Sequence, residues 1–125
     1  MTGAPGHLRR KAERRGRSAE FLVGILYRLQ GYQILETRYR APGGEIDLIA
    51  RRGKLIAFIE VKRRDDENAA IAAVTPKNRR RLESAARSFA ARRPHFDEFA
   101  FRYDIAAVSR FRIKLVKDAW RADAA

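Results

Sequence analysis

The stretch GGEIDLIARRGKLIAFIEVKRR, residues 43–64, contains two apolar-rich runs separated by a short turn. The runs Glu45–Arg51 and Lys54–Lys62 have the length and the β-branched content that are typical of strands. Between them, Arg52-Gly53 is a suitable two-residue hairpin loop. The stretch therefore predicts a β-hairpin, and the rest of the chain can be placed around it.

The predicted loop sets which residues face each other. Residues two apart in a strand share a face of the sheet, and directly opposed residues point to the same side. With Arg52-Gly53 as the loop, Glu45 faces Glu60 and Asp47 faces Phe58. One face of the hairpin then gathers four charged side chains: Glu45, Asp47, Glu60 and Lys62. The opposite face is apolar throughout and is the expected core side.

The charged face predicts a metal site. Two opposed glutamates repel each other, and acids flanked by apolar strand residues are partly desolvated, which disfavours their charged form. A divalent cation relieves both costs, and carboxylate oxygens are the ligands that Mg²⁺ or Mn²⁺ prefers. Lys62 on the same face can orient a water molecule or stabilise charge that develops on a phosphate. The alternative is a solvent-exposed charged hairpin with cross-strand Glu–Lys pairs.

The segment before the hairpin predicts a helix. Ser18 is a suitable N-cap, the helix is expected to reach about Gln30, and Gly31 ends it. Its expected apolar stripe consists of Leu22, Ile25, Leu26 and Leu29. Glu20 lies off that stripe. An acid in the first turn suits the helix dipole, and a role in the charged site is the alternative.

The remaining segments complete an α/β pattern. A strand is expected over 32–40, a polar connection over 63–74, a helix from Thr75 to about Arg93, and strands over 99–109 and 111–116. The second helix has the apolar stripe Leu82, Ala85, Ala86 and Phe89, and Trp120 is expected to pack back from the chain end. The order α-β-β-β-α-β-β predicts a mixed β-sheet flanked by α-helices. One domain is expected over 18–121, after a flexible basic leader (1–17) and before a short tail (122–125).

The charge of the chain indicates a polyanionic partner. The formal net charge is +13, from 28 Lys and Arg residues against 15 Asp and Glu residues. Such an excess does not help folding, whereas contacts to nucleic-acid phosphates release bound counterions. The residues expected to follow phosphates are Arg63, Arg64, Lys77, Arg80, Arg81 and Arg87. A solvated basic surface without a partner is the alternative.

Several classes of site and location are excluded or disfavoured. The chain has no cysteine, so disulfides, thiol catalysis and Cys-based zinc sites are excluded. Its two histidines, His7 and His95, have no partner at ligand spacing. The longest apolar stretch, Phe21–Leu29, is too short to span a bilayer, and no secretory signal is visible. A cytoplasmic protein without a membrane partner is therefore expected.

The motifs resemble a known family. Asp47 followed by Glu60-Val61-Lys62 resembles the PD-(D/E)xK nuclease core, although Ile46 replaces the proline of that motif. The further motifs GRSAE (16–20), GYQIL (31–35), AVTPKNRRRL (73–82) and FRYDIAAV (101–108) are similar to the small bacterial YraN family, distant relatives of archaeal Holliday junction resolvases. The resemblance implies a restriction-endonuclease-like fold, with Asp47 and Glu60 as metal ligands and Lys62 as the catalytic lysine. Glu20 matches the helix acid that resolvase-like relatives bring to the same site, where it would complete the shell of the metal directly or through water. Glu45 matches a family position and is a possible auxiliary acid.

The expected function is a Mg²⁺-dependent endonuclease that hydrolyses DNA, including branched or flapped DNA. The first alternative is an accessory protein that binds nucleic acid without cleaving it. The second is an RNA-directed protein, which the lack of an evident aromatic stacking platform disfavours. Junction-cutting enzymes need two active sites, so by analogy a homodimer is also expected on such substrates.

Overall fold

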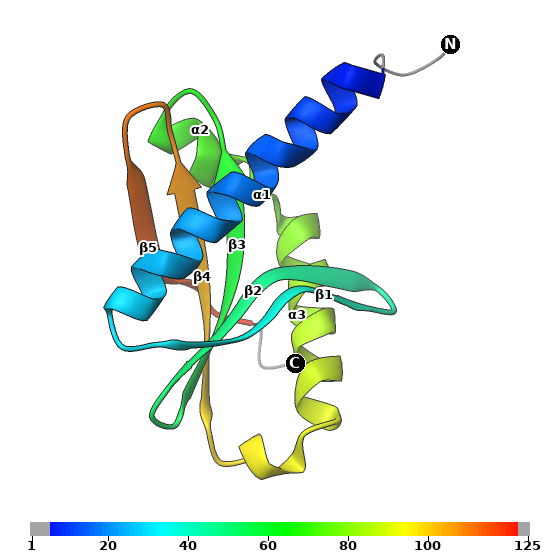
Figure 1. The fold of residues 1–125 in the computed structure, drawn as a ribbon. Helices are drawn as coiled ribbons and strands as arrows, with labels where there is room; N and C mark the ends of the chain where they lie inside the picture. Colours follow the sequence, from blue (N-terminus) through cyan, green and yellow to red (C-terminus); the bar gives the residue numbers. More distant parts are fainter. Residues whose placement is uncertain (1–5, 123–125) are drawn as a thin grey trace.

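The computed structural model describes the backbone of residues 6–122 and the side chains of residues 17–122. Figure 1 shows helices and strands in the order α1 (Gly6–Leu29), β1 (Gln33–Ala41), β2 (Gly44–Arg52), β3 (Leu55–Arg63), α2 (Glu67–Ala72), α3 (Pro76–Ala91), η1 (Pro94–Phe96), β4 (Ala100–Val108) and β5 (Ile113–Trp120). The predicted α/β architecture is confirmed, with α2 as a short addition in the expected polar connection.

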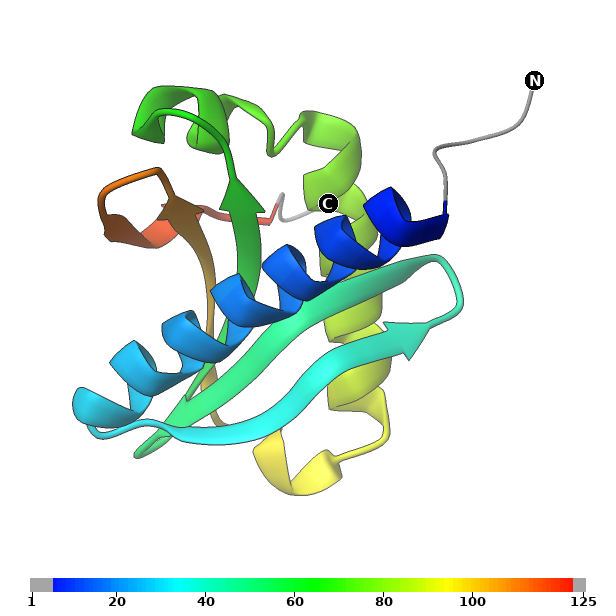
Figure 2. The same cartoon turned by 45° about the horizontal axis from the view of Figure 1, so that its top comes forward.

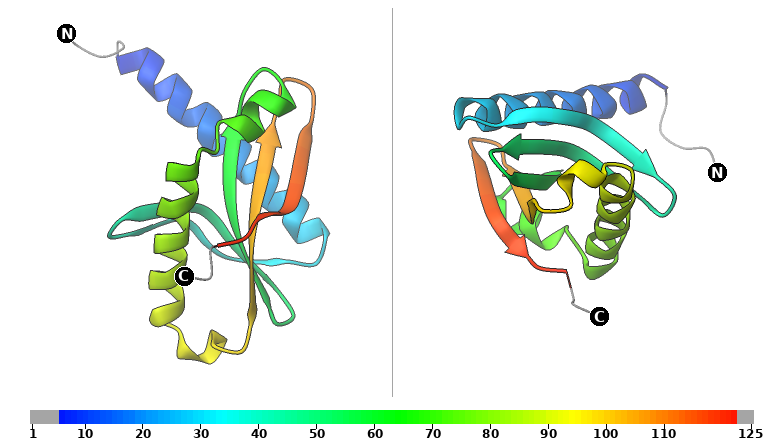
Figure 3. Two further views of the ribbon diagram at one scale, coloured as in Figure 1. Left: turned by 180° about the vertical axis from the view of Figure 1, so that it is seen from behind. Right: turned by 90° about the horizontal axis from the view of Figure 1, so that it is seen from below.

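The five strands form one mixed sheet in the order β1-β2-β3-β4-β5. Strands β3 and β4 are parallel, and the other neighbours are antiparallel. A parallel pair requires a crossover connection, which α2 and α3 provide. Figure 3 shows α1 against one face of the sheet and α3 against the other. The fold is a sheet flanked by helices on both faces.

Each face of the sheet buries its own core. Under α1, the buried residues include Val23, Tyr27, Leu48, Ala57 and Ile59. Under α3, they include Ile49, Ile56, Phe58, Leu82 and Phe89. The expectation that only one face of the hairpin is the core side is therefore wrong. The crossover through α3 covers the second face, as is usual where strands are joined in parallel.

Helix α1 differs from its prediction in its start and in its buried stripe. It begins at Gly6 rather than at Ser18, because the Arg-, Lys- and Ala-rich residues of the expected leader have high helix propensity. The first five residues of that leader lie outside the described part. Ala19, Val23 and Tyr27 are buried, whereas Leu22 and Leu29 of the expected stripe are exposed. Tyr27 determines this orientation, because its hydroxyl donates a 2.8 Å hydrogen bond to the buried Asp104 carboxylate.

The hairpin forms with a loop one residue later than predicted. Arg52 pairs with Leu55, so the loop is Gly53-Lys54. Gly53 has φ +61° at the first loop position, which is the position that a type II′ turn reserves for glycine. The pairings predicted for Glu45 with Glu60 and for Asp47 with Phe58 are therefore wrong. Phe58 pairs with Ile49 instead. The shift amounts to two residues across the pair and leaves the facing of the side chains that pair with β3 unchanged. Ile46, beyond the last pair, packs under α3 rather than with Leu48 and Ala50 under α1.

The second half of the chain follows the prediction closely. Helix α3 begins after Thr75, whose hydroxyl accepts from the Asn78 N–H in a capping box. Its predicted stripe Leu82, Ala85, Ala86 and Phe89 is buried. The last strand, β5, extends to Trp120, so Trp120 lies in the sheet rather than in the tail. Its indole N–H donates to Glu83 of α3.

No helix within residues 6–122 is long and apolar enough to cross a membrane.

Candidate active site

The site lies where the sheet divides. Strand β2 pairs with β3 only as far as Leu48–Ile59, and the β1–β2 hairpin then leaves β3, as Figures 1 and 2 show. Asp47 comes directly after this last pair. Its carboxylate accepts a 2.8 Å hydrogen bond from the backbone N–H of Val61. The division of the sheet therefore holds the Asp47 carboxylate against the Glu60–Lys62 segment of β3.

Asp47 and Glu60 are neighbouring acids whose pKa values are both raised. Burial and, after it, the neighbouring negative charge of Glu60 together raise the pKa of Asp47 to about 8. Burial also raises the pKa of Glu60, whose side chain is only 15% exposed. The Glu60 charge therefore disfavours the charged form of Asp47, whereas the hydrogen bond with Asp47 lowers the pKa of Glu60. A bound cation would relieve this conflict.

Lys62 completes the pattern on β3. Its Nζ lies 3.5 Å from Glu60 Oε1, and its side chain is 23% exposed. The lysine charge lowers the pKa of Glu60 and partly offsets the effect of burial. The structure thus brings together Asp47, Glu60 and Lys62, the three residues on which the sequence prediction most depends.

Glu20 reaches the site from α1. Its charge contributes to the raised pKa of Asp47, which places it in the same electrostatic environment. Its Oε2 accepts a 3.0 Å hydrogen bond from Arg38 Nε of β1. Arg38 has φ +53°, a conformation uncommon for a residue with a side chain. The sequence prediction missed Arg38, because only the paired structure places β1 beside α1.

Helix α3 forms the opposite wall of the site. A cavity of about 220 Å³ is lined by Glu45, Asp47, Glu60, Asn78 and Arg81. Asn78 and Arg81 are three residues apart and share a face of α3. The sequence prediction included Arg81 but missed Asn78, whose only signal was its capping position one turn before Arg81.

The close approach of α3 depends on Gly44. A Cβ atom at Gly44 would lie 1.9 Å from the backbone oxygen of Arg81, a distance that no side chain tolerates. The glycine therefore lets the start of β2 touch the backbone of α3. The same contact keeps Arg81 beside the acidic pair.

The remaining predicted residues, which all lie within residues 17–122, form no hydrogen bond or ion pair with Asp47 or Glu60. Glu45 lines the cavity, but its carboxylate lies 3.8 Å from Arg40 Nε, and it does not face Glu60 as predicted. The other predicted phosphate-contacting residues are exposed and do not line this cavity: Arg63, Arg64, Lys77, Arg80 and Arg87. They are basic surface residues outside the cavity that contains Asp47 and Glu60.

The donor set suits a metal that also binds water and substrate. Within the described residues, no group of three acidic or imidazole side chains lies close enough to hold an ion by itself. The Asp47 and Glu60 carboxylates are the pair available. Mg²⁺ typically uses one or two carboxylates and completes its shell with water and substrate phosphates. The residues present therefore fit such an ion.

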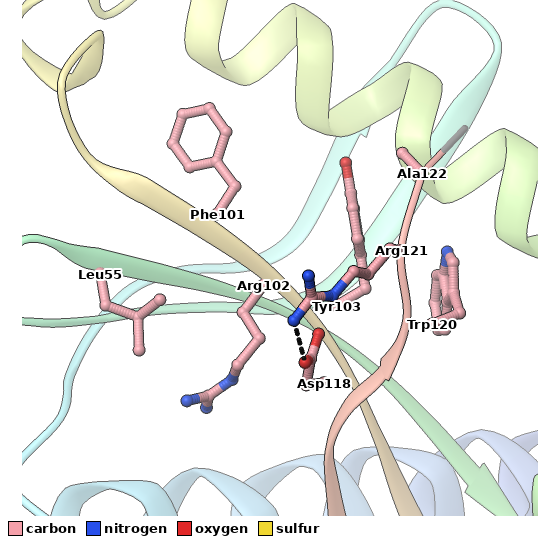
Figure 4. A pocket seen from close by; sticks show the side chains of 8 residues that line it. All are labelled: Leu55, Phe101, Arg102, Tyr103, Asp118, Trp120, Arg121 and Ala122. Atoms are coloured by element: carbon pink, nitrogen blue, oxygen red, sulfur yellow. Dashed lines mark hydrogen bonds and ion pairs between the residues drawn. The ribbon is translucent and has the colours of Figure 1, made fainter. Parts of the chain in front are cut away.

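A larger cavity, of about 540 Å³, lies at the far end of β3, beside Leu55 and Trp120 (Figure 4). Its charged groups are already paired: Arg121 lies 3.1 Å from Asp118, as the dashed line shows, and Arg102 lies 2.7 Å from the buried Asp104. This cavity has none of the acidic candidates. It belongs to the structural network around Asp104.

Comparison with known proteins identifies the family. The sequence pattern of Uncharacterised protein family UPF0102 matches residues 19–108. The chain belongs to the UPF0102 family. A UPF0102 protein of Paramagnetospirillum magneticum is 42% identical over 124 residues, which cover 95% of this chain and 96% of that protein. A UPF0102 protein of Agrobacterium fabrum is 48% identical over 100 residues, or 80% and 82% of the two chains.

A third UPF0102 protein, from Parvibaculum lavamentivorans, is 43% identical over 111 residues, covering 88% of this chain and 84% of that protein. The matched range 19–108 contains Glu20, Asp47, Glu60 and Lys62. The predicted resemblance to the YraN family is thereby confirmed.

Proposed function

We propose that this UPF0102 protein is a metal-dependent endonuclease that hydrolyses phosphodiester bonds of DNA, including branched DNA. The observation that carries the proposal is the half-buried pair Asp47 and Glu60, whose carboxyl pKa values are both raised, with Lys62 Nζ 3.5 Å from Glu60. Such a pair is costly without a cation, and perturbed acids in a cavity mark functional sites more often than structural ones.

Asp47 and Glu60 would hold Mg²⁺ or Mn²⁺, with Glu20 completing the shell directly or through water. When bound, the ion would polarise the scissile phosphate and lower the pKa of a water molecule. The chain's own residues do the positioning. The Val61 N–H fixes the Asp47 carboxylate, and Arg38 fixes that of Glu20.

Lys62 has two roles that follow from its place. Its ammonium group beside Glu60 orients that carboxylate and lowers its pKa, which favours the charged form. Its three donors can also hold the attacking water in line with the leaving oxygen and stabilise charge on the phosphate. Both roles require the charge and the length of lysine.

The basic surface explains how DNA would be held. Arg81 lines the acidic cavity and would contact the phosphate that is cleaved. The exposed Lys77, Arg80 and Arg87 of α3 lie outside the cavity and would contact neighbouring phosphates. A net charge of +13 favours association with any polyanion. Cleavage of both strands of a junction would require a homodimer.

A non-catalytic DNA-binding accessory role is the second candidate. It is favoured by one observation: among the side chains of residues 17–122, no third acid joins Asp47 and Glu60 closely enough to form a complete metal-binding group. The basic surface serves this role equally well. The two candidates differ in whether the acidic pair takes part in turnover.

The direct test is cleavage of labelled four-way junction, flap, single-stranded and duplex DNA with Mg²⁺, Mn²⁺ or EDTA. The wild-type protein is compared with Asp47→Asn, which keeps the size and hydrogen-bonding oxygen of the side chain. We expect metal-dependent cleavage that Asp47→Asn abolishes while DNA binding persists. Binding without cleavage of any substrate by the wild type would favour the accessory role.

A further inference from the structure

A second cavity, of about 330 Å³, lies between α1 and β1 and opens beside the candidate active site. Glu20 and Arg38 line its inner end, and these two side chains form the 3.0 Å ion pair that borders the acidic site. Leu48, which also lines it, directly follows Asp47 in β2. Glu20, whose charge acts on Asp47, is therefore the residue through which this groove borders the acidic site.

One face of α1 forms the wall of the groove. Arg17, Phe21, Gly24 and Arg28 line it, and their spacing of four, three and four residues places them in one row along the helix. Phe21 is 64% exposed although it is a large apolar side chain. Arg17 and Arg28 are exposed at the two ends of the row. The wall thus has an aromatic centre between two cations.

Gly24 keeps the centre of the groove open. A glycine weakens a helix interior relative to alanine. A Cβ atom at Gly24 would have no neighbouring atom within 4 Å, so packing of α1 on the sheet does not require glycine here. The missing side chain instead leaves space beside Phe21, above Ile34 and Leu48 of the sheet.

We propose that this groove binds an unpaired nucleotide of the strand that passes through the active site. The inference rests on the proposed nuclease function and narrows its substrate class to DNA with a single-stranded part. A base has a flat apolar face that stacks on an aromatic ring, and phosphates farther along the same strand would contact the two arginines at the ends of the row. Fully paired duplex cannot enter, because its bases are stacked on each other.

The charges disfavour a second copy of this chain as the occupant of the groove. A second copy would bring another net charge of +13 to a wall that already has Arg17 and Arg28. Phe21, Leu22 and Leu29 are all exposed on α1, so self-association through this helix is the competing occupant. The experiment below separates the two.

The test measures binding of labelled oligothymidylate and of duplex DNA of equal length to the full chain, by fluorescence anisotropy in EDTA. Two variants address the groove: Gly24→Leu fills it, and Phe21→Ala removes its ring. Leu29→Ala is the matched control, because Leu29 is 78% exposed on the same helix and does not line the groove. Thermal unfolding checks that each variant folds.

We expect Gly24→Leu and Phe21→Ala each to weaken single-strand binding about 10-fold. Duplex binding should change less than about twofold, and Leu29→Ala should change neither. If Gly24→Leu does not fold, Phe21→Ala decides the matter.

Equal loss of single-strand and duplex binding, or no loss, would overturn the proposal. So would a wild-type dimer in sedimentation that Phe21→Ala dissociates, which would assign the groove to a second copy. Because EDTA prevents cleavage, single-strand preference can be found even if the protein never cuts DNA. Conversely, cleavage of fully paired duplex with unchanged binding by both variants would refute only the groove.

Discussion

Asp47→Asn is expected to stabilise the metal-free protein while it removes the proposed activity. The raised pKa of Asp47, about 8 against an ordinary value of 3.8, means that the fold disfavours the charged carboxylate. Asparagine has a similar shape and is never charged, and its side-chain oxygen can still accept from the Val61 N–H. The variant should therefore keep the fold and lose only the unfavourable charge.

The magnitude follows from the shift in pKa. Each unit corresponds to about 1.4 kcal/mol, so a rise of about four units sets an upper bound of about 6 kcal/mol on the gain. The Asp47 carboxylate borders an open cavity and keeps part of its hydration. We therefore expect Asp47→Asn to raise the free energy of unfolding by about 1–3 kcal/mol at pH 8.5.

The contribution of Asp47 to stability becomes less favourable as pH rises. Between the unfolded and folded pKa values of Asp47, the folded state binds more protons than the unfolded state, so stability falls as pH rises. The contribution of Asp47 is fully unfavourable above about pH 8 and vanishes below about pH 4. The difference between Asp47→Asn and the wild type should therefore grow from near zero at pH 4 to its full value at pH 8.5.

Urea unfolding in EDTA, followed by circular dichroism at pH 4, 6 and 8.5, measures this difference. Asp97→Asn serves as a control, since Asp97 is exposed. Added Mg²⁺ should stabilise the wild type by an amount that grows with its concentration and should not stabilise Asp47→Asn. A less stable Asp47→Asn at pH 8.5, or a difference independent of pH, would refute the assignment of Asp47 as a half-buried carboxylate repelled by Glu60.

Three further predictions concern the surrounding structure. Gly44→Ala should lower the free energy of unfolding by about 3 kcal/mol, because the new Cβ would meet the Arg81 oxygen. Gly24→Ala, where the new Cβ meets nothing, should be neutral or stabilising by up to about 1 kcal/mol. Equal effects of the two variants in denaturant unfolding would contradict this. Tyr27→Phe should cost about 1–2 kcal/mol, since the buried Asp104 carboxylate loses one donor, and an unchanged unfolding midpoint would argue against that role. Arg80→Ala should lower the slope of log binding constant against log salt by about 0.9 if Arg80 contacts one phosphate, and an unchanged slope would exclude that contact.

The sequence predicted the hairpin well because its signals are local. The alternation of apolar and charged residues determines which side chains share a face, and an error of two residues in pairing leaves that facing intact. Asp47, Glu60 and Lys62 are therefore brought together as predicted. The exact loop was missed because Gly53 suits either loop position in sequence, and only its φ of +61° at the first position distinguishes them.

The features that the sequence did not predict depend on distant contacts. Helix α1 has apolar residues on more than one side, and the hydrogen bond from Tyr27 to Asp104, 77 positions away, determines which side is buried. Asn78 and Arg38 join the site only because α3 and β1 pack beside β2. The division between β2 and β3 arises from sheet twist and pairing, which have no separate signal in the strands themselves.

The central claim is tested most directly by cleavage of labelled flap and junction DNA with Mg²⁺, comparing Lys62→Met with Lys54→Met. Both variants lose one positive charge from the same hairpin, but Lys54 lies exposed in the loop, far along β3 from Glu60. We predict that Lys54→Met cleaves at the wild-type rate and that Lys62→Met is slower by at least about 100-fold. Equal rates for the two variants, or cleavage that persists in EDTA, would contradict the account.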